Sequence, residues 1–291
     1  MSQAISPLRE HYPLVDGQMF CAARRPFSRG ESVVVTIPGG PGLSGDYLQP
    51  FLAKLSEATA LNTALLDLPN HGRSVIKPEA MPLTYSGCLK LLDSALHEIS
   101  GKCGGIVLFG QSFGARLAFD LLATSGIKFR GAVLTGFPYQ FEISKALLRK
   151  LGSLELEAFT GSPKDEEVFA RNWRKLIPHY TAQPLATEVF EQLASGTRWA
   201  GNDAMIEAPP SLESVAAIIN AQPAAATRVL ILQGSADPVV PDRNTEALKR
   251  VIPAARFREV PEAGHFVMIE KPEPTLSAMA DFIRGLGVVG A

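Results

Sequence analysis

The sequence Ile106-Val107-Leu108-Phe109-Gly110-Gln111-Ser112-Phe113-Gly114 joins a short apolar run to a GxSxG motif, and an amphipathic stretch then continues to Ala123. A continuous run of β-branched and aliphatic residues is typical of a strand that is buried on both faces. Because the next stretch has helical spacing, the motif lies in a sharp strand-to-helix turn. Such a turn predicts strained φ and ψ angles at Ser112, with small residues on either side that let neighbouring backbone approach.

Strand-like and helical stretches alternate along most of the chain. This order predicts an α/β fold with a mainly parallel central sheet and helices on both of its faces. A DG turn between apolar flanks at 14–20 predicts an antiparallel hairpin at one edge of the sheet. The strand-like runs are 33–37, 64–66, 106–109, 132–134, 229–232 and 257–260, and the helical stretches are 47–59, 86–99, 113–123, 244–251 and 274–284.

The alternation stops after Leu134. Residues 137–227 contain helix-like pieces separated by prolines and no convincing buried strand. We therefore expect a core formed by residues 1–136 and 228–291, with residues 137–227 inserted between two core strands as a helical cap. Some aromatic residues of this cap are expected to line a mainly apolar pocket. The candidates are Phe141, Phe159, Phe169, Trp173, Tyr180, Phe190 and Trp199.

A serine nucleophile needs a base, and the chain contains five histidines. His265 follows the strand-like run 257–260 and precedes the last helical stretch, which is a suitable place for that base. His97 lies in a predicted helix, His11 near the N-terminus and His179 in the insertion. His71 lies in a tight loop, where a structural role is favoured.

Asp237 is the candidate partner of this base. The sequence Gly234-Ser235-Ala236-Asp237-Pro238 follows the strand-like run 229–232. A carboxylate at the end of that strand can orient the imidazole and compensate its positive charge. Asp242 is a weaker candidate, because it is expected to cap the next helix. We predict that Ser112, Asp237 and His265 act together, and they follow one another in that order along the chain.

Two backbone amides are candidates for binding the negative charge that develops in a reaction at Ser112. The sequence Pro38-Gly39-Gly40-Pro41-Gly42 follows the strand-like run 33–37, and its glycines leave backbone N–H groups unobstructed. Phe113 opens the helix after Ser112, at the positive end of the helix dipole. We assign the N–H groups of Gly40 and Phe113 as the oxyanion hole, each worth on the order of 3–4 kcal/mol of transition-state stabilisation.

Composition and charge limit the possible partners. The chain has 28 Lys and Arg against 29 Asp and Glu, so its formal net charge of −1 provides no cationic field for nucleic acid or anionic lipid. The N-terminal sequence has no signal-peptide pattern, and no stretch approaches the roughly 18 apolar residues of a membrane span. Three irregularly spaced cysteines favour a reducing compartment. We therefore expect a cytoplasmic protein without nucleic-acid or membrane partners.

With these motifs assigned, the sequence resembles the α/β-hydrolase fold family over 33–136 and 228–284. Pro38–Gly42 is similar to the HGGPG loop of the proline iminopeptidase branch, and Asp67–Ser74 resembles the DxxGxGxS loop of many members. Two positions depart from the iminopeptidase pattern, because Pro38 replaces the usual histidine and Phe113 replaces a tryptophan.

The resemblance implies a role for each candidate residue. Ser112 would be the nucleophile, His265 the general base and then acid, and Asp237 the residue that orients it. Gly40 and Phe113 would provide the oxyanion donors.

The leading hypothesis is a serine hydrolase that cleaves an ester, lactone or amide of a small molecule or short peptide through an acyl-enzyme. Three alternatives stay open: a proline iminopeptidase-like aminopeptidase, an acyltransferase or cyclase that uses the same residues, and a non-catalytic small-molecule binder. No cofactor or metal is expected, because the sequence has no HExxH motif and no Cys/His ligand cluster.

Overall fold

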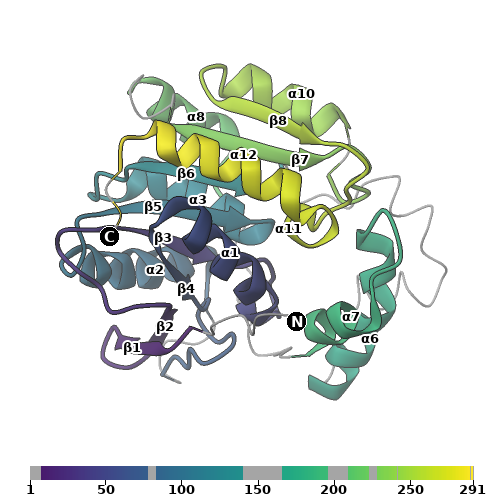
Figure 1. Ribbon diagram of the computed structural model, residues 1–291, viewed down its shortest axis with the longest axis horizontal. Coiled ribbons are helices and arrows are strands. Elements are labelled where there is room, and N and C mark those ends of the chain that lie inside the picture. Colours follow the sequence, from purple (N-terminus) through teal and green to yellow (C-terminus); the bar gives the residue numbers. More distant parts are fainter. Residues whose placement is uncertain are drawn as a thin grey trace.

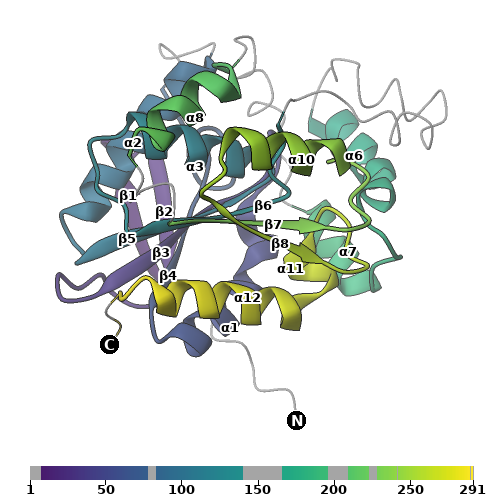
Figure 2. The same cartoon turned by 90° about the horizontal axis from the view of Figure 1, so that it is seen from above.

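Eight strands form one sheet in a computed structural model of the chain, in the order β1-β2-β4-β3-β5-β6-β7-β8 (Figures 1 and 2). Strands β3 to β8 run parallel, whereas β1 and β2 pair antiparallel at one edge. The structure describes residues 8–77, 83–139, 166–195, 209–222, 228–240, 242–288 and 290. The strands are β1 (Glu10–Leu14), β2 (Met19–Ala23), β3 (Ser32–Ile37), β4 (Asn62–Leu66), β5 (Gly105–Gln111), β6 (Gly131–Thr135), β7 (Val229–Gly234) and β8 (Arg256–Val260).

Helices cover both faces of the sheet. Figure 2 shows α2, α3, α8 and α10 on one face and α1, α11 and α12 on the other. This arrangement confirms the predicted α/β architecture. The predicted hairpin is also confirmed, and its strands pair from Leu14 with Met19 onward. The helices of these two layers are α1 (Gln49–Thr59), α2 (Tyr85–Ser100), α3 (Phe113–Thr124), α8 (Leu212–Asn220), α10 (Asp242–Val251), α11 (Val267–Glu270) and α12 (Pro272–Gly285).

The central strands are mostly apolar because each of them supplies side chains to two cores. In β3, Val33 and Val35 pack into the core beneath α2 and α3, whereas Val34 packs into the core beneath α1 and α12. All six residues of β3 are buried. Successive side chains of a strand point to opposite faces, so a sheet that is covered on both sides favours unbroken apolar runs.

Three described helices lie between β6 and β7: α6 (Glu166–Tyr180), α7 (Thr187–Ala194) and α8. The described part of 137–227 contains no strand. Helix α8 packs in the same layer as α3 and α10 (Figure 2), whereas α6 and α7 lie beyond the carboxyl ends of the strands (Figure 1). The division of the chain into a core of 1–136 and 228–291 and a cap of 137–227 stays a prediction.

The five predicted helices agree with the observed boundaries to within two residues, and the short helix α11 was not predicted. The stretch 47–59 begins with a 3-10 turn at Gly45–Leu48, and α1 starts only at Gln49. Pro50 stands in the first turn of α1, where its missing N–H costs nothing and its fixed φ favours a helix start. The one-turn helix α11 before α12 is too short to give a periodic sequence signal.

None of the helices that the structure describes is long and apolar enough to cross a bilayer.

A buried ion pair links α3 to its neighbours. Arg116 Nε donates to Asp120 Oδ1 at 2.9 Å, and the two side chains are only 2% and 1% exposed. Tyr85 of α2 donates its hydroxyl to Asp120 Oδ2 at 2.7 Å, and Arg116 also donates to the carbonyl oxygen of Pro210, just before α8. The pair therefore ties α2 and the chain that enters α8 to α3, the helix that follows Ser112.

We predict that Asp120→Ala lowers the free energy of unfolding by about 3–5 kcal/mol, because Arg116 then keeps a buried charge without its partner. Urea denaturation of the variant measures the change. Asp281→Ala is the control, since Asp281 and Arg284 form an exposed pair, and its expected effect is below about 0.5 kcal/mol. Equal effects of the two substitutions would contradict the role of the buried pair.

Candidate active site

Ser112 lies in the turn between β5 and α3 with φ 52° and ψ −118°. Residues other than glycine rarely adopt a backbone conformation with such a positive φ. Its N–H donates to the carbonyl oxygen of Thr135 at 2.8 Å, which ties the turn to the end of β6. A Cβ on Gly114 would lie 2.2 Å from the carbonyl oxygen of Ile37, so the first turn of α3 touches the end of β3. The GxSxG sequence therefore forms the sharp strand-to-helix turn that its residues predict.

The structure brings together the three side chains predicted from the sequence. His265 Nε2 lies 2.8 Å from Ser112 Oγ, and His265 Nδ1 lies 2.9 Å from Asp237 Oδ2. The side chains of His265 and Asp237 are 2% and 1% exposed, whereas Ser112 is half-buried. A hydrogen-bonded chain thus runs from a half-buried hydroxyl to a buried carboxylate.

The loop after β7 fixes the Asp237 carboxylate. Its Oδ1 accepts the N–H groups of Val239 at 2.8 Å and Val240 at 3.1 Å, which leaves Oδ2 directed at the imidazole. An imidazole that donates from Nδ1 to this oxygen presents Nε2 as an acceptor to Ser112. The arrangement can therefore withdraw a proton from the serine hydroxyl.

Glu270, in α11, holds the loop that carries His265. Its Oε2 accepts the N–H groups of Gly264 at 2.9 Å and Ala182 at 2.7 Å, and its Oε1 accepts the N–H of Phe266 at 3.1 Å. The carboxylate thus bonds the amide on each side of His265 and joins them to the chain that follows α6. Sequence analysis missed Glu270, because a glutamate in a four-residue helix has no pattern that separates it from a surface residue.

The predicted oxyanion loop, Pro38–Gly42, follows β3 directly and lies beside Ser112. A Cβ on Gly114, two residues after Ser112, would lie 2.3 Å from the carbonyl oxygen of Pro38. Phe113 begins α3, so its N–H belongs to the first turn of that helix. The two assigned donors, Gly40 and Phe113, therefore come from adjacent backbone segments on the same side of the sheet.

Aromatic residues of α6 pack beside the predicted oxyanion loop and His265. The ring of Phe169 occupies the space beside Gly42, where a Cβ would lie 2.2 Å from its Cζ. The Tyr180 ring packs edge-on against His265, with ring centroids 5.5 Å apart, and burial and the nearby Asp237 charge raise the pKa of its hydroxyl. Trp173 packs against Tyr180, whereas Phe190 of α7 stacks on the Arg174 guanidinium. Phe141, Phe159 and Trp199 lie outside the described residues.

The three cysteines are poor candidates for a rival nucleophile. All of them are free and buried, and burial raises the pKa of each thiol, that of Cys88 to about 12. A thiol with a raised pKa forms little of the reactive thiolate. Over the described residues, no group of three or more His, Cys, Asp and Glu side chains gathers in a way that could hold a metal ion.

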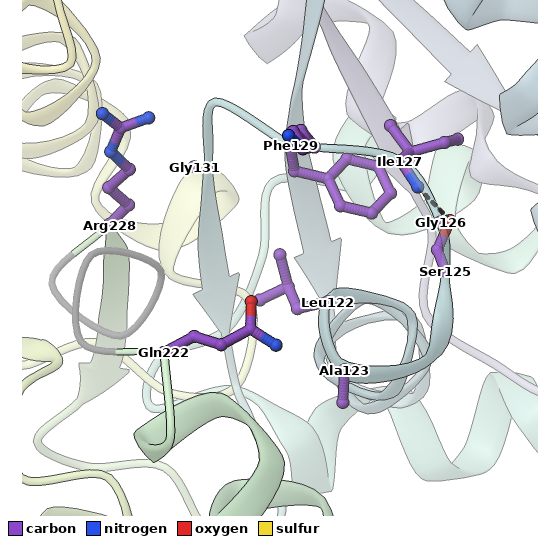
Figure 3. A pocket seen from close by; sticks show the side chains of 10 residues that line it. Leu122, Ala123, Ser125, Gly126, Ile127, Phe129, Gly131, Gln222 and Arg228 are labelled. Carbon is purple, nitrogen blue, oxygen red and sulfur yellow. Dashed lines mark hydrogen bonds between the residues drawn. The ribbon is translucent and has the colours of Figure 1, made fainter.

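A cavity of about 520 Å³ lies at the opposite end of the sheet (Figure 3). Leu122 at the carboxyl end of α3 and Phe129 before β6 line it, together with Gln222 and Arg228. Because Ser112 stands at the other end of α3, this cavity has no access to the serine. The candidate active site is therefore at the carboxyl ends of the strands.

Comparison with known proteins supports one family. A sequence model described as "Alpha/beta hydrolase family" matches residues 34–278. A search of curated proteins found no match.

Solved structures with similar folds include two bacterial esterases. The chain is 20% identical to a thermophilic esterase from Thermogutta terrifontis, with a TM-score of 0.67 and coverage of 96% of this chain and 99% of that one. It is 15% identical to an esterase from Exiguobacterium antarcticum, with a TM-score of 0.68 and coverage of 94% and 98%. MenH from S. aureus is 19% identical, with a TM-score of 0.66 and coverage of 92% and 98%. At these identities the likeness shows the fold.

We predict that Glu270→Met lowers the free energy of unfolding by about 2–4 kcal/mol, because three part-buried N–H groups lose their acceptor, each near the low end of the roughly 1–3 kcal/mol of a fully buried group. Urea denaturation measures this loss, and hydrogen exchange should show faster exchange at the Gly264 amide. Glu270→Gln keeps one acceptor oxygen and should lose less. Glu262→Gln, at an exposed ion pair with Lys271, is the control. Unchanged Gly264 exchange in the methionine variant would refute the role of Glu270.

Proposed function

The chain belongs to the α/β-hydrolase family, and on this premise we propose that it is a serine hydrolase that cleaves a small-molecule ester, lactone or amide through an acyl-enzyme. One observation carries the proposal: Ser112, His265 and Asp237 form a continuous hydrogen-bonded chain. A binder without catalytic activity has no chemical need for all three groups in this geometry.

The first half of the reaction forms the acyl-enzyme. Ser112 Oγ attacks the substrate carbonyl carbon while His265 Nε2 takes the hydroxyl proton, and the Asp237 carboxylate balances the charge of the imidazolium. The carbonyl oxygen becomes an oxyanion that the N–H groups of Gly40 and Phe113 bind. When this intermediate collapses, the bond to the leaving group breaks and His265 returns its proton to the leaving alcohol or amine.

The second half repeats the same steps with water. His265 takes a proton from a water molecule, whose oxygen attacks the acyl carbon. The bond to Ser112 Oγ then breaks, the serine regains its proton from His265, and the carboxylic acid leaves. Each residue returns to its starting protonation state, so the cycle consumes one water molecule for each bond cleaved.

An ester is the favoured substrate class. Two of the structurally similar proteins are esterases by name, and their chains are covered almost completely by this fold. The apolar rings of Phe169 and Tyr180 near the oxyanion loop and His265 favour an apolar acyl or alcohol group over a charged one. An activated ester with a short apolar acyl chain, such as p-nitrophenyl butyrate, is therefore the first substrate to test.

We predict that the wild-type protein hydrolyses p-nitrophenyl butyrate and reacts covalently with a fluorophosphonate, and that Ser112→Ala loses both reactions. The reason is that only Ser112 has a base in contact with its hydroxyl among the groups of this site. Intact-protein mass spectrometry detects the adduct, and Ser125→Ala is the control because Ser125 follows the carboxyl end of α3, at the opposite end of that helix from Ser112. An adduct of undiminished yield in the Ser112→Ala variant would reject the nucleophile.

We predict that Asp237→Asn lowers kcat for the same ester by roughly 10³- to 10⁴-fold, because an amide in place of the carboxylate favours the wrong imidazole tautomer. Asp242→Asn, five residues further along the chain, is the matched control and should retain the wild-type kcat. The initial rate of p-nitrophenol release gives kcat for both variants. A large loss in the Asp242 variant, with the Asp237 variant active, would reverse the assignment.

A further inference from the structure

The oxyanion loop contains only three N–H groups, because Pro38 and Pro41 have none. Two of the three already have partners. Gly39 N–H donates to the Tyr47 hydroxyl at 3.0 Å, and Gly42 N–H donates to His71 Nε2 at 2.6 Å. In the part of the chain that the structure describes, the Gly40 N–H has no acceptor. Within the described ranges, the loop therefore offers one free donor, the Gly40 N–H. Side chains of Tyr47 and His71 accept the N–H groups of Gly39 and Gly42 on either side of it.

His71 meets the loop with a defined tautomer. Its Nδ1 lies 2.7 Å from the carbonyl oxygen of Pro69, which can only accept, so Nδ1 carries the proton. Nε2 is then an acceptor and takes the Gly42 N–H. The imidazole is 2% exposed, so water competes little for either bond. The tight loop after β4 is thereby connected through one ring to the far end of the oxyanion loop.

Tyr47 meets the near end of the loop. Its hydroxyl accepts the Gly39 N–H and donates to Gln111 Oε1 at 2.8 Å. Burial raises the pKa of Tyr47, which keeps the hydroxyl protonated and able to make both bonds. Because Gln111 immediately precedes Ser112, this chain of bonds joins the oxyanion loop to the nucleophile turn.

Helix α6 also confines the oxyanion loop at Gly42. Its φ of +94° lies in the left-handed region, and the ring of Phe169 fills the space where a Cβ would stand. The Gly42 amide is therefore held between an aromatic ring of α6 and the imidazole of His71. A rotation of this peptide that released its N–H would lose a buried hydrogen bond.

We propose that His71 and Tyr47 are positioning residues that accept the two outer N–H groups of the oxyanion loop, so that the Gly40 N–H stays directed at the oxyanion. The inference rests on the proposed function, because it deepens the role of the same site. Preorganised donors stabilise a developing charge without having to reorient during the reaction. Loss of either acceptor frees an outer N–H and lets the loop relax away from this arrangement.

The decisive comparison is His71→Met against His71→Gln. The two side chains have nearly the same length, but glutamine offers a strong acceptor oxygen near the position of Nε2, whereas the methionine sulfur is only a weak acceptor. We expect the methionine variant to lose about 10- to 100-fold in kcat for p-nitrophenyl butyrate, less than the roughly 10²- to 10³-fold loss for a deleted oxyanion donor. KM should change less than about threefold, since ground-state binding does not use the oxyanion hole. The glutamine variant should recover most of kcat.

A transition-state analogue separates positioning from general damage to the fold. Ser112 Oγ adds to the carbonyl carbon of an alkyl trifluoromethyl ketone, its proton passes to His265 Nε2 and the carbonyl oxygen becomes an oxyanion, whereas the matching methyl ketone binds without this step. The His71→Met variant should bind the trifluoromethyl ketone more weakly by the same factor as it loses kcat, with methyl ketone binding unchanged. Equal weakening of both ketones, or a wild-type kcat in a folded methionine variant, would overturn the inference.

A measurement on the wild-type protein covers the case in which the variants fail to fold. In amide NMR spectra, addition of the trifluoromethyl ketone should move the Gly40 proton strongly downfield, while the Gly39 and Gly42 protons keep their positions. A shift at Gly39 or Gly42 in place of Gly40 would overturn the inference. Failure of the ketone to form any adduct with Ser112 would instead reject the proposed function.

Discussion

The first turn of α3 lies in direct contact with the end of β3, and the rest of the site depends on this contact. Any side chain on Gly114 would meet the carbonyl oxygens of Ile37 and Pro38. Ser112 immediately precedes this turn, and the oxyanion loop follows Ile37 in the chain. The absence of a Cβ at Gly114 therefore lets the turn that carries Ser112 lie close to the oxyanion loop.

Sheet topology then brings the remaining groups to the same edge. Ser112 follows β5, Asp237 follows β7 and His265 follows β8, and these strands run parallel, so their carboxyl ends lie on one side. This is why the sequence was sufficient to predict that the three side chains meet: each lies within five residues of the end of a strand-like run, and a parallel sheet brings such positions to one edge. The strands, most helices and the edge hairpin were predictable for the same reason.

The residues that hold these groups in place were less accessible to sequence analysis. Glu270 accepts the N–H of Gly264, and Tyr47 accepts the N–H of Gly39, from loops a few residues earlier in the chain. Such bonds depend on packing and have no spacing rule, because one buried acceptor can be provided by many residue types at many positions. The tight loop of His71 predicted a structural role, but its partner, Gly42, became identifiable only once β3 and β4 were paired.

Helix α6 is connected to both halves of the site. Near its start, Phe169 packs on Gly42 of the oxyanion loop, and at its end the Tyr180 carbonyl accepts the His265 N–H at 2.9 Å. Just beyond, Ala182 shares the Glu270 carboxylate with the His265 loop. A displacement of α6 relative to the sheet would therefore strain the donor loop and the base together. Helix α6 thus contacts both the oxyanion loop and the loop of His265, and its position helps to fix the geometry of the candidate site.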